Sequence, residues 1–448
     1  MSLTNTKRKA LSISAAVAAI GLLAGCGSAS APAPAAPAAD AGPVTIDVWG
    51  WDAESTQHVV DAFNASHDKI KVNYVLQASN TATQTNFRNV MESKKDIPCW
   101  IPGIAPISTV LVNGWAQDIT KYIEPIKDTY SKGAQAAAQV DGKYYGFPAG
   151  PSATFMMANK AVYEKYGLAV PKTWEDFVTT GKELKTHGVT VINLAGEDPS
   201  TLLQMSQQAG ANWFAIDGDK WKVNLQDDAT MKAVDIIQKL VDNDLVAHQT
   251  YKDRPALYSY FDSGQLATVP LAWWSMTGYQ TNFKASLGQW QAVDVPQFKD
   301  AKQFVSSGFA DPGFVPVGCE HPAAAVEYIN WTSSSKDAIE AGRNKKTGSV
   351  GVPTNLADVS AYTADVVPDK IFGAQPAAEV GAVISKAQNA AVGKFERGPN
   401  YDAWFPELQD QWGKAMAKQI TLKQAMANVQ AFIAKDLDSK GIKYEVSK

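Results

Sequence analysis

Cysteine, positive charge and long apolar runs are all scarce in this sequence. Among 448 residues only three are cysteine, and the formal net charge is −4. No apolar run reaches the roughly 18 residues that a membrane-spanning helix requires, which excludes a multi-pass membrane protein. The slightly acidic balance disfavours a nucleic-acid-binding protein, because a phosphate backbone favours a basic surface.

The sequence also lacks the motifs that mark common catalytic sites. It contains no Gly-x-Ser-x-Gly elbow, no His-Glu-x-x-His zinc motif, no Walker loop and no Gly-x-Gly-x-x-Gly after a strand. The five histidines are dispersed, and none lies at metal-ligand spacing from another His or Cys. We therefore expect no metal, no cofactor and no enzymatic activity. A glycosidase stays open as an alternative, because two carboxylates about 5–9 Å apart suffice for that chemistry.

Tryptophan, in contrast, is abundant. The chain contains 13 Trp within a composition that is 45% hydrophobic and 19% charged, which is typical of a globular protein with two or three domains. Trp is large, and 13 exceed what a core of this size usually needs. Some of the rings are therefore expected to contact a ligand.

Residues 1–25 are predicted to be a signal peptide. The basic run Lys7–Lys9 precedes the apolar stretch Leu11–Ala24, which is too short for a transmembrane helix. The stretch ends in Leu23-Ala24-Gly25-Cys26, which resembles a bacterial lipobox. This resemblance implies cleavage before Cys26 and attachment of diacylglycerol to its sulfur. The alternative is a plain secretory leader with an incidental Cys.

Residues 26–43 are predicted to be a tether. Their Ala-Pro repeats have no periodic apolar pattern and favour a semi-extended chain. Cleavage removes three positive charges and no negative one, so the formal charge changes from −4 to −7. We expect a protein anchored by lipid on the extracytoplasmic face of the cell membrane.

Two cysteines, Cys99 and Cys319, remain in the folded region. Outside the cell two cysteines often pair, since no glutathione pool keeps them reduced. The sequence alone does not bring their Cα atoms within bridging distance. A disulfide and two buried free thiols both stay open.

The folded region begins with an α/β pattern. Alternating apolar residues predict strands at Val44–Trp49 and Ile70–Leu76, with an amphipathic helix through Val60 and Phe63 between them. A second amphipathic stretch leads to a short strand that ends at Trp100. This order predicts a doubly wound domain with a largely parallel sheet.

A second α/β pattern begins near residue 152. Thr154–Met157 and Val189–Leu194 are predicted strands, and Thr173 is predicted to cap a helix through Phe177. Further elements are a hairpin turn at Asp141-Gly142, a helical core stripe at Met231–Val241, and helices at Ala323–Trp331 and Leu422–Ile433.

Several blocks, in order, resemble the extracellular solute-binding proteins of sugar-importing ABC transporters, the maltose-binding-protein-like group. The most specific are Val140–Pro148, Asn159–Gly167, Pro171–Phe177 and Phe261–Thr268 followed by Trp273-Trp274. The similarity spans nearly the whole mature chain. Ser152 stands where maltose-type members carry an acidic residue, and Ala158 stands where the family commonly has Tyr. These departures leave the fold prediction intact and leave the sugar open.

The resemblance implies an α/β, two-lobed periplasmic-binding-protein fold, with a doubly wound sheet flanked by helices in each lobe and ligand in the cleft between them. Lobe one would comprise residues 44–150 and 307–353. Lobe two would comprise residues 151–306 and 354–448, including the C-terminal helices. The implied function is capture of a mono- or oligosaccharide by hinge closure and its delivery to permease subunits.

The candidate ligand-binding residues are aromatic and acidic side chains, chiefly at strand ends. A sugar offers an apolar face to an aromatic ring and a rim of hydroxyls to hydrogen-bonding groups. In open α/β sheets, ligands bind outside the carboxyl ends of strands. The candidates are Trp51, Asp52, Trp100, Ser152, Glu197, Asp198, Trp273, Trp274 and Trp404.

Each candidate has a structural alternative. The acidic residues are also explained as hydrogen-bond acceptors or surface charges. Trp404, which matches the family's C-terminal aromatic over the cleft, is equally explained by helix packing beside Leu408 and Trp412. Arg397 faces either the cleft or solvent. A binding protein of this fold for a non-sugar solute is the remaining functional alternative; a phosphorylated ligand would call for Arg, Lys or helix N-termini.

Overall fold

The computed structural model describes residues 43–446, apart from residues 54, 346–347, 360–361, 363–364, 369 and 393–394. The predicted signal peptide, the tether and Cys26 lie outside the described residues, except for Pro43 at the end of the tether. Within the described part of the chain, none of the helices combines the length and the apolar character that a bilayer crossing needs.

The chain begins with the predicted strand–helix–strand unit. Strands β1 (Val44–Gly50) and β2 (Ile70–Leu76) pair in parallel with Val44 opposite Ile70, and helix α1 (Ser55–Ser66) connects them. Val60 and Phe63 of α1 are buried against this pair. The alternation of apolar residues predicted this unit correctly, because each strand buries one face under α1.

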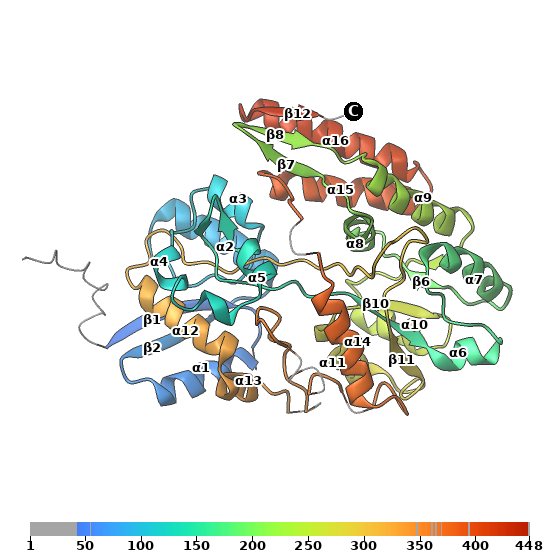
Figure 1. The fold of residues 1–448 in the computed structure, drawn as a ribbon, viewed down its shortest axis with the longest axis horizontal. Helices are drawn as coiled ribbons and strands as arrows, with labels where there is room; N and C mark the ends of the chain where they lie inside the picture. The colour runs from blue at the N-terminus through green and yellow to red at the C-terminus, as the bar shows by residue number, and fades with distance from the viewer. Residues whose placement is uncertain are drawn as a thin grey trace, which may run out of the picture. The chain divides into compact units, whose positions relative to one another are not determined.

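Lobe one is completed by short elements and by a returning segment of the chain (Figure 1). The Asp141-Gly142 turn joins its hairpin as predicted, with both residues at positive φ. The elements are α2 (Asn80–Ser93), α3 (Ile107–Val112), α4 (Thr120–Ile123), η1 (Lys127–Thr129), α5 (Lys132–Ala137), β3 (Gln139–Val140), β4 (Lys143–Tyr144), α12 (Pro322–Ser334) and α13 (Lys336–Ala341).

A disulfide joins Cys99 to Cys319, with their Cα atoms 4.8 Å apart. The bridge fastens the short segment before Trp100 to the segment that returns from lobe two. On that returning segment, Phe314 pairs with Ile101 in an antiparallel bridge. Two stretches of chain 220 residues apart in sequence are therefore held side by side both covalently and by backbone hydrogen bonds.

Lobe two contains a three-stranded antiparallel sheet and a separate two-stranded parallel sheet. In the antiparallel sheet, the central strand β5 (Phe155–Asn159) is fully buried and pairs antiparallel with both β10 (Thr268–Leu271) and β11 (Trp290–Val293). β5 carries the chain into the lobe, while β11 leads it back towards residue 306, so the two strands run in opposite directions. Parallel pairing remains between β6 (Ile192–Asn193) and β9 (Val246–Ala247).

Helices surround these sheets, and a small outer sheet completes the lobe (Figure 1). Thr173 and Thr421 cap their helices as predicted, each accepting a hydrogen bond from a backbone N–H three residues on. The elements are α6 (Lys160–Lys165), α7 (Trp174–Thr186), α8 (Ser200–Ala209), β7 (Phe214–Asp217), β8 (Lys220–Val223), α9 (Asp228–Asp242), α10 (Arg254–Asp262), η2 (Trp273–Ser275), α11 (Met276–Asn282), α14 (Ala377–Asn389), α15 (Tyr401–Met416), α16 (Leu422–Ser439) and β12 (Tyr444–Val446).

The segments expected to join the lobes lie against one another. Thr154 N donates to Ser307 O at 2.8 Å, and Ser152 N donates to Phe309 O at 3.3 Å. A Cβ on Gly150 would lie 1.7 Å from Thr354 O, so only glycine allows this close approach of two crossing segments.

The hydrophobic packing does not follow the expected boundary at residue 353. Ile339, Val350 and Val352 precede that boundary, yet they pack in the same cluster as Leu271 and Phe372 of lobe two. Side chains from both parts of the chain therefore share a core next to the crossing segments.

Replacing both Cys99 and Cys319 by alanine is expected to lower the free energy of unfolding by about 2–5 kcal/mol, because the bridge restricts a very long loop in the unfolded chain. Guanidinium denaturation of the wild type and the double variant measures this difference. A reducing agent should destabilise the wild type and leave the double variant unchanged. Equal midpoints for the two proteins under oxidising conditions would contradict the prediction.

Candidate functional site

A cavity lies at the carboxyl end of β1, with side chains of both predicted lobes in its walls. Its volume is about 650 Å³, within the range of roughly 300–1,000 Å³ that is common for small-molecule sites. Of the nine candidate residues, those that line it are Trp51, Asp52, Trp100, Trp273 and Trp274. We call this space the tryptophan cavity.

Trp51 and Asp52 follow β1 directly and are held by its neighbours. Tyr74 of β2 donates its hydroxyl proton to Asp52 O at 2.7 Å, and Thr56 N of α1 donates to Asp52 Oδ1 at 3.2 Å. The Asp52 carboxylate thus lies at the N-terminus of α1, where negative charge is favoured. Trp51 is 39% exposed, so its ring is accessible to a solute.

Trp100 is fixed far more firmly than Trp51. Its carbonyl accepts a hydrogen bond from Trp49 N at 3.1 Å, and Cys99 N donates to Asp47 O at 2.8 Å, so this segment pairs with β1 in a parallel bridge. The indole lies against Gly313, where an added Cβ would be 2.2 Å from Trp100 Cζ2. Only 9% of Trp100 is exposed.

Trp273 and Trp274 form the opposite wall, immediately after β10. Trp273 is half-buried and packs against Gly351, where an added Cβ would lie 3.3 Å from its Cη2 atom. Trp274 is 57% exposed. Folding rarely leaves a Trp so open, since burying it removes a large apolar surface from water.

The described lining of the tryptophan cavity is almost uncharged. Among the described residues that line it, Asp52 is the single charged side chain, and there is neither Lys nor Arg. Residues with hydroxyl or amide groups also line it: Ser55, Thr56, Thr277, Tyr328, Thr332, Ser333, Asn344, Ser349 and Asn355. Such a lining suits a neutral solute with both apolar faces and hydroxyl groups.

The sequence profile of the bacterial extracellular solute-binding protein family matches residues 58–370. The chain belongs to this family. Members of this family bind solutes outside the cytoplasm, so this chain is an extracytoplasmic solute-binding protein. This confirms the family resemblance of the sequence blocks.

Two curated relatives of this solute-binding protein resemble it at low identity. A lactose-binding protein of Rhizobium radiobacter is 22% identical over 431 residues, covering 89% of this chain and 96% of the relative. An arabinooligosaccharide-binding protein of Halalkalibacterium halodurans is 24% identical over 230 residues, so the match spans 49% of this chain and only 50% of that protein.

A solved structure confirms the predicted two-lobed α/β fold. The galacto-N-biose-/lacto-N-biose I-binding protein of an ABC transporter from Bifidobacterium longum, determined with lacto-N-biose, superimposes with a TM-score of 0.78 at 21% identity. The superposition covers 91% of this solute-binding protein and 100% of that chain.

Glu197, Asp198 and Ser152 do not line the tryptophan cavity. Glu197 accepts hydrogen bonds from Thr250 Oγ1 at 2.5 Å and Tyr251 N at 2.7 Å. Burial disfavours its charge, but these hydrogen bonds outweigh burial and lower the pKa of Glu197. Asp198 accepts from Ser200 N at 3.0 Å at the start of α8, and Ser152 lies in a crossing segment.

Trp404 is in the core, which corrects its expected place over the cleft. It is fully buried, stacks on Phe214 with ring centroids 5.6 Å apart, and donates its Nε1–H to Arg397 O at 2.9 Å. The physical reason is helical spacing. Trp404, Leu408 and Trp412 recur every four residues on α15 and face one core.

Sequence reasoning missed the polar lining residues of α12 and of the segment that follows α13, which are Thr332, Ser333, Asn344, Ser349 and Asn355. They have no motif, and they reach the cavity only because the chain crosses back between the lobes. One signal was present: Ser349 and Asn355 flank the predicted lobe boundary at residue 353, and the segments that join the lobes border the cleft in this fold.

Gly313→Ala is expected to displace the Trp100 indole and to destabilise this solute-binding protein by about 1–3 kcal/mol, because the site has no room for a methyl group. Thermal unfolding and near-ultraviolet circular dichroism measure the two effects. Gly196→Ala is the matched control, since its Cβ would meet nothing within 4 Å. Identical unfolding of both variants would contradict the assigned position of Trp100.

Proposed function

We propose that this protein captures a neutral mono- or oligosaccharide and delivers it to the permease of an ABC importer. The observation that carries the proposal is the tryptophan cavity, which Trp51, Trp100, Trp273 and Trp274 line and whose described lining includes a single charged side chain. Sugar rings stack their C–H faces on indoles, and the surrounding hydroxyls and amides satisfy the sugar hydroxyls.

Hinge closure is the proposed mechanism of capture. The proposed lobes are residues 44–150 with 307–353 and residues 151–306 with 354–448. A ligand favours a closed arrangement only by contacting both lobes. Trp51 and Trp100 come from the first lobe and Trp273 and Trp274 from the second, so a solute in the cavity has partners on both sides.

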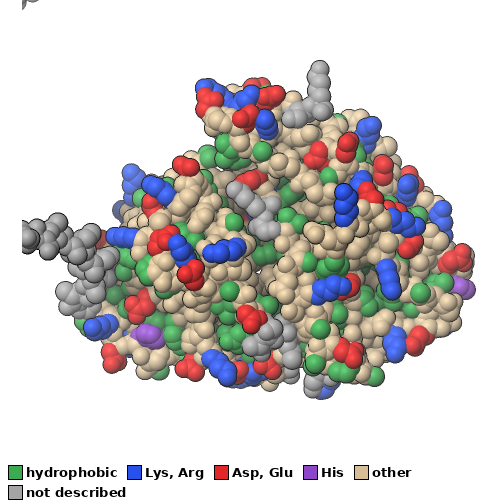
Figure 2. Space-filling view, viewed as in Figure 1, with side chains coloured by type: hydrophobic (Ala, Val, Ile, Leu, Met, Phe, Trp, Pro, Cys, Tyr) green, Lys and Arg blue, Asp and Glu red, His purple; other side chains and the backbone are tan. Residues whose placement is uncertain are grey.

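The named ligands of the relatives support a sugar. They are lactose, arabinooligosaccharide and lacto-N-biose, all neutral saccharides. On the face shown in Figure 2, acidic and basic side chains are interspersed without a large area of either sign, which agrees with a partner other than nucleic acid.

Binding without catalysis is the better account of the cavity. Glycoside hydrolysis needs two carboxylates, and among its described lining residues Asp52 is the single carboxylate. A phosphorylated solute would call for Arg or Lys in the lining, and the described lining has neither. The described lining therefore supports binding of a neutral sugar better than it supports glycoside hydrolysis or binding of an anionic solute.

Trp274→Ala is expected to weaken sugar affinity by at least about tenfold, because the exposed indole is lost as a stacking surface. Trp100→Ala combined with it should abolish binding. Calorimetric titration with lactose, lacto-N-biose and arabinooligosaccharides measures affinity, and the melting temperature reports ligand binding independently.

Ile216→Ala is the matched control, since Ile216 is a large apolar residue, 60% exposed, on the outer sheet of lobe two. It should bind as the wild type does. Undiminished affinity in Trp274→Ala would overturn the role of this residue, and the absence of binding to any neutral sugar would overturn the proposed ligand.

We also propose that Cys26 carries a lipid anchor after removal of residues 1–25, and that residues 26–43 tether the folded part to the membrane. The support is the lipobox-like sequence and the extracytoplasmic location of the family. Two acyl chains on one residue anchor a protein stably, whereas a single chain does not.

Cys26→Ala is expected to move the protein from the membrane fraction to the soluble fraction, because the sulfur that carries the acyl chains is removed. Fractionation and mass spectrometry of the N-terminal peptide measure this. Retention of the variant on membranes in wild-type amounts would contradict the anchor.

A further inference from the structure

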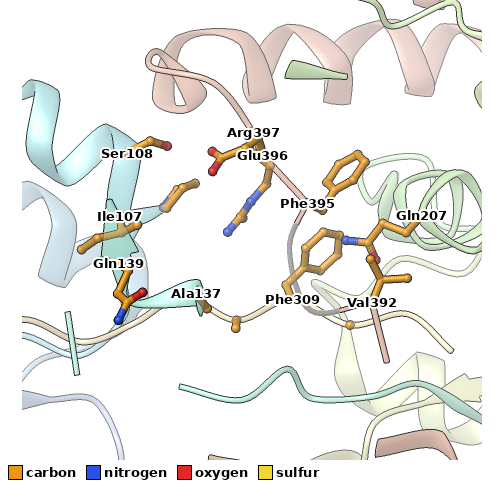
Figure 3. A pocket seen from close by; sticks show the side chains of 13 residues that line it. Ile107, Ser108, Ala137, Gln139, Gln207, Phe309, Val392, Phe395, Glu396 and Arg397 are labelled. Atoms are coloured by element: carbon orange, nitrogen blue, oxygen red, sulfur yellow. The ribbon is translucent and has the colours of Figure 1, made fainter. Parts of the chain in front are cut away.

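Arg397 lies in the connection between α14 and α15, on the lobe-two side of a small cavity (Figure 3). The connection is fixed to lobe two by two contacts. Trp404 Nε1 donates to Arg397 O at 2.9 Å, and Phe395 packs edge-on against Trp213 at 5.3 Å. Both tryptophans belong to the core of lobe two.

From this position the connection reaches residues of lobe one. The Arg397 guanidinium donates to the Asp311 carboxylate, and Ser108 Oγ of α3 donates to Gly398 O at 3.2 Å. Asp311 packs closely against Gly103 of lobe one. A Cβ added to Gly103 would lie only 1.9 Å from the backbone carbonyl oxygen of Asp311. The ion pair therefore joins two elements that are anchored in different lobes.

This ion pair differs from the other ion pairs of the described chain in its burial. Arg397 is 5% exposed, and its guanidinium lies 5.2 Å from the Phe309 ring centroid and 4.7 Å from that of Tyr401. A buried guanidinium without its anion is strongly disfavoured. Separation of the lobes at this point would break the charge-assisted hydrogen bond between Arg397 and Asp311 and leave both groups to water.

The packing around the ion pair is incomplete, as expected for a contact that forms and breaks. The adjacent cavity has a volume of about 40 Å³ and lies between Ser108 of α3 and Gln207 of α8 (Figure 3). Gln207 is 2% exposed, and neither atom of its side-chain amide has a hydrogen-bond partner within the described chain. The two lobes thus meet here around a small cavity that contains an unpartnered amide.

We propose that Arg397–Asp311 and Ser108–Gly398 form an interlobe clasp, which holds the lobes in the arrangement that assembles the tryptophan cavity. Arg397 is then a positioning residue: it touches no solute, and it sets how often the cavity is formed. The consequence for affinity rests on the proposed sugar-binding function, but the effect of the clasp on the lobes does not. A protein whose binding-competent state is less populated binds more weakly in proportion.

The test is single-molecule energy transfer between dyes on Asp61→Cys of α1 and Lys182→Cys of α7, both exposed positions on different lobes. It uses the mature chain with Cys26→Ala, in which the remaining native cysteines are bridged. Arg397→Met is expected to raise the fraction of molecules with separated lobes about tenfold without any ligand. Asp311→Asn breaks the same pair from the other side and should act in the same direction.

Lys232→Met is the matched control, because it removes the Lys232–Asp300 ion pair within lobe two. It should leave the distribution unchanged, and Arg397→Lys should restore part of the wild-type distribution. Unchanged distributions in both Arg397→Met and Asp311→Asn would overturn the clasp, as would a shift towards closed lobes. The readout uses no sugar, so its failure leaves the proposed ligand standing, and a failure of sugar binding leaves this readout intact.

Discussion

The pairing of residues 99–101 with two distant segments is the constraint on which the binding cavity depends. Cys99 and Trp100 are each joined to β1 by a backbone hydrogen bond, Ile101 is joined to Phe314 by two more, and a disulfide joins Cys99 to Cys319. Together these bonds fix the position of Trp100 along β1, next to the carboxyl end of the strand that Trp51 and Asp52 follow. Without that register the three side chains would not share one wall.

The opposite wall comes from a separate lobe, so the cavity exists only when the lobes adopt the right arrangement. Crossing segments that approach as closely as Gly150 and Thr354 restrict how the lobes move relative to each other. The proposed clasp at Arg397 would bias the same motion. Affinity in this account comes from two sources: stacking and hydrogen bonding in the cavity, and the population of molecules in which it is assembled.

Local features of this chain could be predicted from its sequence, and those that depend on chain crossings could not. The β1–α1–β2 unit and the cap at Thr173 follow from apolar alternation and from side chains near in sequence. Trp51 and Trp100 could be predicted to lie near each other because each stands at the carboxyl end of a strand, and these ends share one edge of a sheet. That Glu197 lies outside the tryptophan cavity could not be predicted, because its hydrogen bonds to Thr250 and Tyr251 come from residues distant in sequence. The antiparallel pairing of β5 was missed because strand direction depends on where the chain enters and leaves the lobe.

The central claim is that a sugar binds among four particular indoles, and the most direct measurement is the set of Trp Nε1–H resonances in a nitrogen–proton correlation spectrum during titration with lacto-N-biose or lactose. The chain has 13 such groups. The resonances of Trp51, Trp100, Trp273 and Trp274 are expected to shift together and saturate, while those of core residues such as Trp404 and Trp412 stay in place. Saturable shifts confined to other indoles, with these four unmoved, would contradict the claim.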